Sequence, residues 1–118
     1  MNKEILTAAG IDCDEALKRF LGDEALYTQV LTAFAQDDVA RRAKTAFDND
    51  DKKALLGAVH EAKSSSGSAG LKNVYPLACE VVDMLRHGGY TDEQLRDSFA
   101  HFEIAYREAQ LAVKEALD

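Results

Sequence analysis

The C-terminal third of the chain carries the pattern that most restricts its fold. Between residues 95 and 113, apolar side chains recur at steps of 4, 3, 4, 3 and 4 residues: Leu95, Phe99, Phe102, Tyr106, Ala109 and Val113. This is the heptad spacing of a helix that buries one face against other helices. Thr91 and Gln94 match a capping box and place the start of this helix. The remaining residues must therefore supply helices that cover its apolar face.

Upstream, residues that start and stop helices divide the chain into four further segments, none with the alternation of a strand. Asp12 and Asp23 are suited to cap the first two helices. Asn73 is suited to cap the fourth, which places Pro76 in its first turn. The expected helices span about residues 12–22, 23–47, 52–70 (loosening at its Ser/Gly-rich end), 73–87 and 91 onward. Residues 1–118 are predicted to form one all-α domain, an antiparallel up-and-down four-helix bundle with an additional short N-terminal helix.

The charge balance limits the possible partners. With 14 Lys and Arg against 21 Asp and Glu, the net charge is -7, which disfavours nucleic acid because phosphate binding needs a clustered basic surface. No apolar run approaches the roughly 20 residues of a membrane span, and we find no secretory signal, so we expect a cytoplasmic protein without membrane contact. Cys13 and Cys79 have neither metal-site nor disulfide spacing and are expected to be buried free thiols.

The third expected helix contains a histidine among small residues. At about 100° per residue, one arc of this helix is apolar enough to face a core. The residues of that arc are Leu55, Val59, Ala62, Ser66 and Ala69. His60 lies roughly 140° from Leu55 and shares its side of the helix with Lys63, Ser64 and Gly67. The imidazole is therefore expected to point into solvent.

His60 combines this exposure with nearby positive charge. An exposed imidazole offers a nucleophilic nitrogen near neutral pH, and no Ser or Cys triad pattern accompanies it, so hydrolytic catalysis is disfavoured. Phosphoryl acceptance fits better, because it requires an in-line approach and stabilised charge on the phosphoryl oxygens. Lys63, one turn later, supplies a cation, while the small residues Ser64 and Gly67 leave room for another protein.

The run from His60 to Gly70 resembles the motif of histidine-containing phosphotransfer (HPt) domains, His-x-x-Lys-Gly-x-x-x-x-x-Gly on a bundle helix. His60, Lys63 and Gly70 match directly, Gly67 is also common, and the segment FLGDEALYTQVLTAF is similar to the family's preceding helix. The resemblance implies that His60 accepts a phosphoryl group from a receiver-domain aspartate and passes it to another receiver. It also implies that Lys63 stabilises the phosphoryl group and that Ser64 gives room.

The same resemblance implies partners and cofactors. The partners would be a response-regulator receiver domain, a hybrid histidine kinase, or both, and the chain is expected to act as a monomer. It would bind no metal or other cofactor itself, because the Mg²⁺ needed for the reaction belongs to the receiver. The sequence has no kinase region or ATP site, so the chain would be a phosphoryl carrier that another protein must charge.

Three positions depart from the family pattern. Ser64 stands where Gly is usual, Ala62 where a larger aliphatic residue is common, and Val82 where some members place a Gln that hydrogen-bonds the histidine. Because Ser is small, docking of a partner is expected to survive. The orientation of the imidazole would be looser or would depend on another group.

A docking patch is expected beside the histidine. The core positions expected on the second helix are Leu26, Val30 and Ala33. Tyr27 and Leu31 widen the apolar arc beyond these positions and, with Leu56 one turn before His60, are expected to form a patch for a receiver domain. The alternative is that Tyr27 and Leu31 pack against the first helix.

Two other classes of function are weighed against phosphotransfer. One is a helical adaptor that binds a receiver or a histidine kinase without phosphotransfer. The other, a metal- or cofactor-binding bundle, would need inward-facing His/Glu pairs such as Glu-x-x-His, which the sequence lacks. His87 and His101 have no neighbours like those of His60 and are expected to be structural or incidental.

Overall fold

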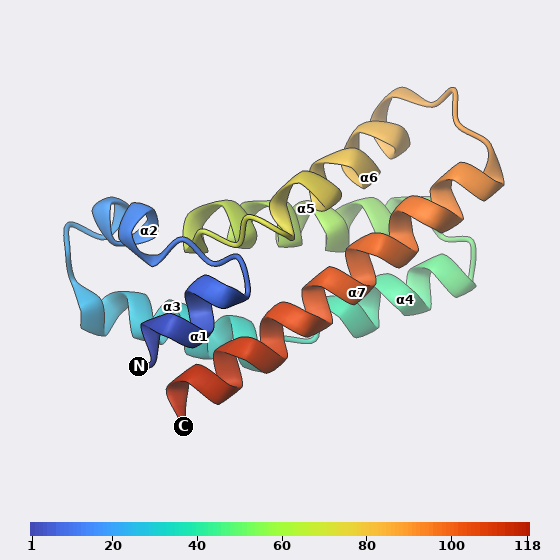
Figure 1. Ribbon diagram of the computed structural model, residues 1–118. Coiled ribbons are helices and arrows are strands. Elements are labelled where there is room, and N and C mark those ends of the chain that lie inside the picture. Colours follow the sequence, from blue (N-terminus) through green and yellow to red (C-terminus); the bar gives the residue numbers. More distant parts are fainter.

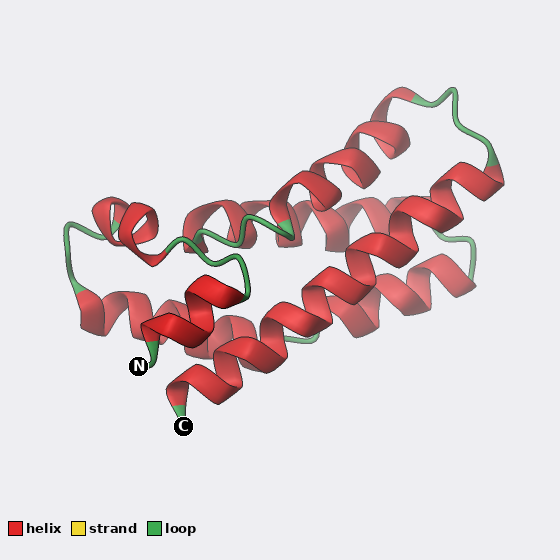
Figure 2. Ribbon diagram, in the orientation of Figure 1, coloured by secondary structure: helices red, strands yellow, loops and turns green.

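The computed structural model describes residues 1–118 as seven helices joined by short connections (Figures 1 and 2). In chain order the helices are α1 (Lys3–Ala8), α2 (Cys13–Arg19), α3 (Glu24–Gln36), α4 (Val39–Asp48), α5 (Lys52–Ala69), α6 (Tyr75–His87) and α7 (Asp92–Leu117). The only β-type pairing is an isolated bridge between Ile11 and Leu71. The expected all-α class is confirmed. None of the seven helices is both long enough and apolar enough to cross a membrane.

One apolar core runs between the long helices. α5 packs against α4 and α6, and α7 packs against α3, α4 and α6. The expected core face of α7 is confirmed, because all its heptad positions are buried: Leu95, Phe99, Phe102, Tyr106, Ala109 and Val113. The Thr91 capping box also forms, with the Gln94 N–H donating to Thr91 Oγ1 at 3.1 Å. Both termini lie at one end of the molecule, where the Asn2 N–H donates to the Ala116 carbonyl at 2.8 Å (Figure 1).

The second helix expected from the sequence is interrupted at Asp37, which separates α3 from α4. Asp37 Oδ1 accepts the Val39 N–H at 3.1 Å, and Asp37 Oδ2 accepts the Tyr106 hydroxyl of α7 at 2.6 Å. Gln110 of α7 donates from Nε2 to the Phe34 carbonyl at the end of α3, at 2.9 Å. The prediction of one continuous helix is wrong because two side chains of α7 satisfy polar groups that the break exposes.

The N-terminal region also differs from the prediction. α2 occurs where the first helix was expected, with Asp12 as its cap, whereas α1, which the Asn2 side chain caps, was not predicted. Asn73 does not cap α6; its amide donates to the Ala9 carbonyl at 3.1 Å, and Val74 takes the cap position. Pro76 lies in the first turn of α6 as expected. Asn73 therefore holds the α1–α2 connection against the start of α6 rather than starting the helix.

Gly70 ends α5 and fixes where α2 lies. α5 stays helical through the Ser/Gly-rich segment to Ala69, so the expected loosening is wrong. Gly70 has a left-handed φ of 78°, and a Cβ at this position would lie 2.6 Å from the Asp12 carbonyl oxygen. The Asp12 N–H donates to the Gly70 carbonyl at 2.9 Å, and the Lys72 N–H donates to the Gly10 carbonyl at 3.1 Å. A side chain at residue 70 would break this junction, which sets α2 beside the C-terminal end of α5.

Candidate functional site

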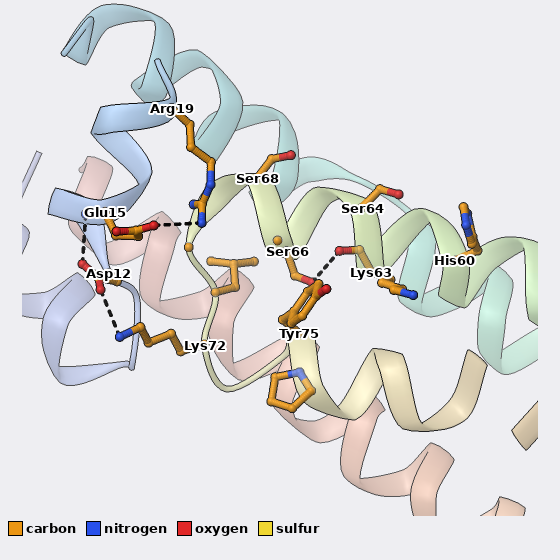
Figure 3. A pocket seen from close by; sticks show the side chains of 14 residues that line it. Asp12, Glu15, Arg19, His60, Lys63, Ser64, Ser66, Ser68, Lys72 and Tyr75 are labelled. Atoms are coloured by element: carbon orange, nitrogen blue, oxygen red, sulfur yellow. Dashed lines mark hydrogen bonds and ion pairs between the residues drawn. The ribbon is translucent and has the colours of Figure 1, made fainter. Parts of the chain in front are cut away.

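His60 lies in the middle of α5 on the face opposite the core. The expected core positions of this helix are all buried: Leu55, Val59, Ala62, Ser66 and Ala69. His60 itself is exposed, as the helical pattern predicts. No hydrogen bond reaches its imidazole in the close view of the site (Figure 3). The ring is therefore free to meet a group brought by another molecule.

Lys63 supplies the positive charge nearest to His60 along the helix. It is half-buried, one turn after His60, and its ammonium group takes part in no ion pair (Figure 3). Other cations of this region are paired: Lys72 lies 3.0 Å from Asp12, and Arg19 lies 3.2 Å from Glu15. Lys63 is thus the one cation of the region available to an incoming anion.

His60 and Lys63 lie in an open groove that is lined mostly by polar and small residues and runs along α5 toward α2 and the start of α6 (Figure 3). We call this the His60 groove. Its lining residues are Asp12, Glu15, Arg19, His60, Lys63, Ser64, Ser66, Gly67, Ser68, Gly70, Leu71, Lys72, Tyr75 and Pro76. The expected site residues His60, Lys63, Ser64 and Gly67 are therefore brought together.

The contribution of α2 to the groove was not predicted from the sequence. Asp12, Glu15 and Arg19 reach it only because the Gly70 junction holds α2 against the end of α5. The backbone N–H of Glu15, followed by the ammonium of Lys72, lowers the pKa of Asp12, so this carboxylate stays charged and paired. Asp12 and Glu15, the two acids of the groove, are each paired with a cation, so the remaining charge of the groove is the positive charge of Lys63.

Gly67 has a different role from the one expected. A Cβ at this position would lie 3.0 Å from Cε1 of the Tyr75 ring. The space that Gly67 leaves is therefore filled by a side chain of α6 and not kept for a partner. Gly57, by contrast, has no atom near the position of its missing Cβ, and Ser64 is exposed. Room beside His60 thus exists at Gly57 and Ser64.

The expected docking role of Tyr27 and Leu31 is wrong, because both side chains are fully buried. The Tyr27 hydroxyl donates to the Ala69 carbonyl at 2.7 Å, and its ring lies 5.7 Å from that of Phe20 at the end of α2. The alternative, packing toward the first predicted helix, is thus the correct one for Tyr27.

The physical reason is that α3 turns a different face toward the core from the one predicted. The larger side chains take the core face, where Tyr27, Leu31, Phe34 and Ala35 are buried. Leu26 is 42% exposed and Ala33 is exposed, although both were expected in the core. Leu56 of the expected patch is half-buried and packs against the core, so it offers only part of its surface.

Val82 is fully buried in the core of α6. Because the valine side chain has no polar atom, this position supplies no hydrogen bond to the imidazole of His60. Cys13 is buried as expected and Cys79 is half-buried; both are free thiols. His87 and His101 are exposed and lie outside the His60 groove.

Comparisons with known proteins support the fold. No family model matches the sequence, and no curated protein matches it. Among solved structures, the chain is similar to the crystal structure of the HPT domain from the Hpt sensor hybrid histidine kinase of Shewanella, with a TM-score of 0.82. The alignment covers 92% of this chain and 94% of that chain at 18% sequence identity. The chain therefore has the fold of an HPt domain.

Proposed function

We propose that this chain is a histidine phosphotransfer intermediate of a two-component phosphorelay. His60 accepts a phosphoryl group from the aspartate of one receiver domain and passes it to another receiver. The observation that carries this proposal is an exposed, unpaired imidazole on the central helix of an HPt fold, with the unpaired cation of Lys63 one turn away. His87 and His101 are also exposed, but they lie outside the His60 groove, so the groove and Lys63 distinguish His60 from them.

The transfer itself needs little from this chain besides position and charge. A lone pair of an imidazole nitrogen attacks phosphorus in line, the nitrogen–phosphorus bond forms, and the bond to the aspartate oxygen breaks to release a carboxylate. Lys63 lies where its charge can offset the charge on the phosphoryl oxygens. The Mg²⁺ for the reaction would be held by the receiver. The reverse sequence returns the phosphoryl group to an aspartate.

The proposed partners are a response-regulator receiver domain, a hybrid histidine kinase, or both, meeting a monomer of this chain in the cytoplasm. The partner would dock over the His60 groove, because the groove is open and holds the acceptor. We also propose that α3 and α4 together occupy one position of an antiparallel four-helix bundle, with α5, α6 and α7 in the other three. This bundle would hold α5 rigid while a partner covers the outer face of that helix.

The test is to mix the chain with a receiver domain carrying labelled phosphate and Mg²⁺, and to follow the label. We expect label on the chain that is labile in acid and stable in base, as phosphohistidine is. His60→Gln should abolish it, whereas His87→Gln and His101→Gln, which change two other exposed histidines, should leave it intact. Label retained by His60→Gln would contradict the proposal.

The adaptor alternative predicts a different result. An adaptor would bind the receiver with the same affinity before and after His60→Ala, and it would take up no label. Measuring binding by calorimetry beside the labelling experiment therefore separates the two functions.

A further inference from the structure

Ser64 differs from Ser65 and Ser66, the two serines that directly follow it on α5. The Ser65 hydroxyl donates to the Ala62 carbonyl at 3.3 Å, and the Ser66 hydroxyl donates to the Lys63 carbonyl at 3.2 Å. Both hydroxyls are thus occupied by their own helix. The Ser64 hydroxyl is exposed, lines the His60 groove and has no hydrogen bond within the chain (Figure 3). It remains available as a donor to an outside group.

Helix geometry places this hydroxyl beside the acceptor. Ser64 follows His60 by four residues, and side chains at this spacing are neighbours, with about 5–6 Å between their Cβ atoms. Side chains of a helix lean toward its N-terminal end, so Ser64 leans toward His60. Figure 3 shows both side chains on the same side of α5, whereas the side chain of Lys63 extends along the other side of the helix.

We propose that the Ser64 hydroxyl donates a hydrogen bond to the phosphoryl group carried by His60. This inference rests on the proposed function and adds a second phosphoryl-binding residue to it. Phosphoryl oxygens are strong acceptors, and a serine hydroxyl is a donor that rotates to suit them. A glycine at this position would give room but no donor. Ser64 therefore stabilises the phosphorylated form of this chain relative to a chain with a small apolar residue there.

The experiment measures an equilibrium, because an equilibrium separates contact with the phosphoryl group from contact with the partner. Labelled receiver and this chain are mixed with Mg²⁺, and the label on each is measured after exchange is complete, from both starting directions. The ratio compares free phosphorylated and free unphosphorylated proteins, so contacts made only in the complex cancel. Ser64→Ala should shift this constant toward the receiver by about 3- to 10-fold, the effect of losing one exposed hydrogen bond.

Two matched variants control for other effects. Ser64→Thr keeps the hydroxyl and should stay within about twofold of the parent, as expected if the donor itself acts. Ser68→Ala removes an exposed serine of the same groove, one turn further along α5. Its position is about 12 Å along the helix axis from His60, beyond reach of the phosphoryl group, so its constant should equal that of the parent.

Two outcomes overturn the inference in distinguishable ways. If the parent takes label on His60 and Ser64→Ala leaves the equilibrium unchanged, Ser64 makes no bond to the phosphoryl group, even if the rate of transfer changes. If the parent takes no label from any receiver or from phosphoramidate, the proposed function itself fails and the inference falls with it.

Discussion

Two polar regions of this molecule differ in whether their side chains have hydrogen-bond partners within the chain. At the α3–α4 junction, formed by Asp37, Tyr106 and Gln110, each side chain has hydrogen-bond partners, and Tyr106 is fully buried. In the His60 groove, the imidazole of His60 and the ammonium of Lys63 have none (Figure 3). The junction joins elements of the fold, and the groove presents groups to a partner.

The difference follows from burial. A polar group out of water must be paired, or it costs stability, whereas an exposed group is paired by water until a partner arrives. Burial raises the pKa of Asp37 despite the hydrogen bonds that it accepts from Tyr106 and the Val39 N–H. The comparison teaches that changes to the exposed, unpaired groups of the groove, such as Lys63, should affect transfer without affecting stability, and that changes at the junction should do the reverse.

The largest effect after loss of His60 is expected from Lys63→Ala. Removing the unpaired cation should slow transfer from a saturating receiver by about 10- to 100-fold, less than for a charge-stabilising donor in a site closed to water, because Lys63 is only half-buried. The free energy of unfolding should change by less than about 0.5 kcal/mol, because this side chain has no ion pair to lose. Label transfer followed by rapid quench and urea unfolding measure the two quantities.

Lys53→Ala is the matched control, since Lys53 is exposed on the same helix and lies outside the groove. It should leave both the rate and the stability as in the parent. An equal loss of rate in Lys53→Ala and Lys63→Ala would mean that overall charge, and not the position of Lys63, governs transfer.

Tyr106→Phe tests the other side of the comparison. It removes the hydroxyl that donates to Asp37 Oδ2 at 2.6 Å and leaves that carboxylate with fewer partners. The free energy of unfolding should fall by about 1–2 kcal/mol, the usual result when one partner of a shielded hydrogen bond is lost. The rate of label transfer should not change. A variant as stable as its parent would show that water replaces the hydroxyl at the junction.

The pH dependence of stability sharpens the same point. Burial is the largest cause that raises the pKa of Tyr106 above its ordinary value of 10.0, followed by the hydrogen bond to Asp37. Because the folded-state pKa is raised, the stabilising contribution is complete below about pH 10 and is lost as pH rises, at up to about 1.4 kcal/mol per pH unit. Burial raises the pKa of Tyr27 in the same direction.

Urea unfolding at several pH values above 10 should therefore show falling stability, and Tyr106→Phe should make the decline less steep. The Tyr27 contribution remains in that variant, so part of the slope persists. An identical slope in parent and variant would mean that Tyr106 ionises as readily in the folded chain as in the unfolded chain.

Local patterns were enough for two helices of this fold. The heptads of α7 and the core arc of α5 were predicted correctly, because each has one apolar face and a polar remainder. On α3, apolar residues lie on two adjacent faces, and periodicity cannot choose between them. Side-chain size would have identified the core face, since Tyr27, Leu31 and Phe34 are each larger than the residue directly before them and are the ones that are buried.

The candidate site was predictable only as far as it lies on one helix. His60, Lys63 and Ser64 follow from the helical spacing of α5, but Asp12 and Arg19 enter the groove through backbone bonds between loops about 60 residues apart, for which no local signal exists. The break at Asp37 did have a signal, two consecutive Asp residues in a helical run, since Asp favours helix starts over interiors.

The smallest predicted effect compares two glycines of α5. At Gly57 an added Cβ would meet no atom, so Gly57→Ala should raise the free energy of unfolding by about 0.5–1 kcal/mol through helix propensity. At Gly67 the same Cβ would lie 3.0 Å from Cε1 and 3.2 Å from Cδ1 of Tyr75. The ring must shift, so Gly67→Ala should gain less than Gly57→Ala. Urea unfolding of the two variants measures this difference.

The effect of Gly67→Ala depends on how far the Tyr75 ring can move. Tyr75 is 41% exposed, so its ring has solvent to move into, and a partial shift would leave a small net gain. Combining Gly67→Ala with Tyr75→Ala should then restore the full propensity gain relative to Tyr75→Ala alone, because the obstacle is gone. If instead Gly67→Ala gains as much as Gly57→Ala with Tyr75 present, the ring does not hold the α5–α6 contact, and the smallness of residue 67 would again need a partner outside the chain to explain it.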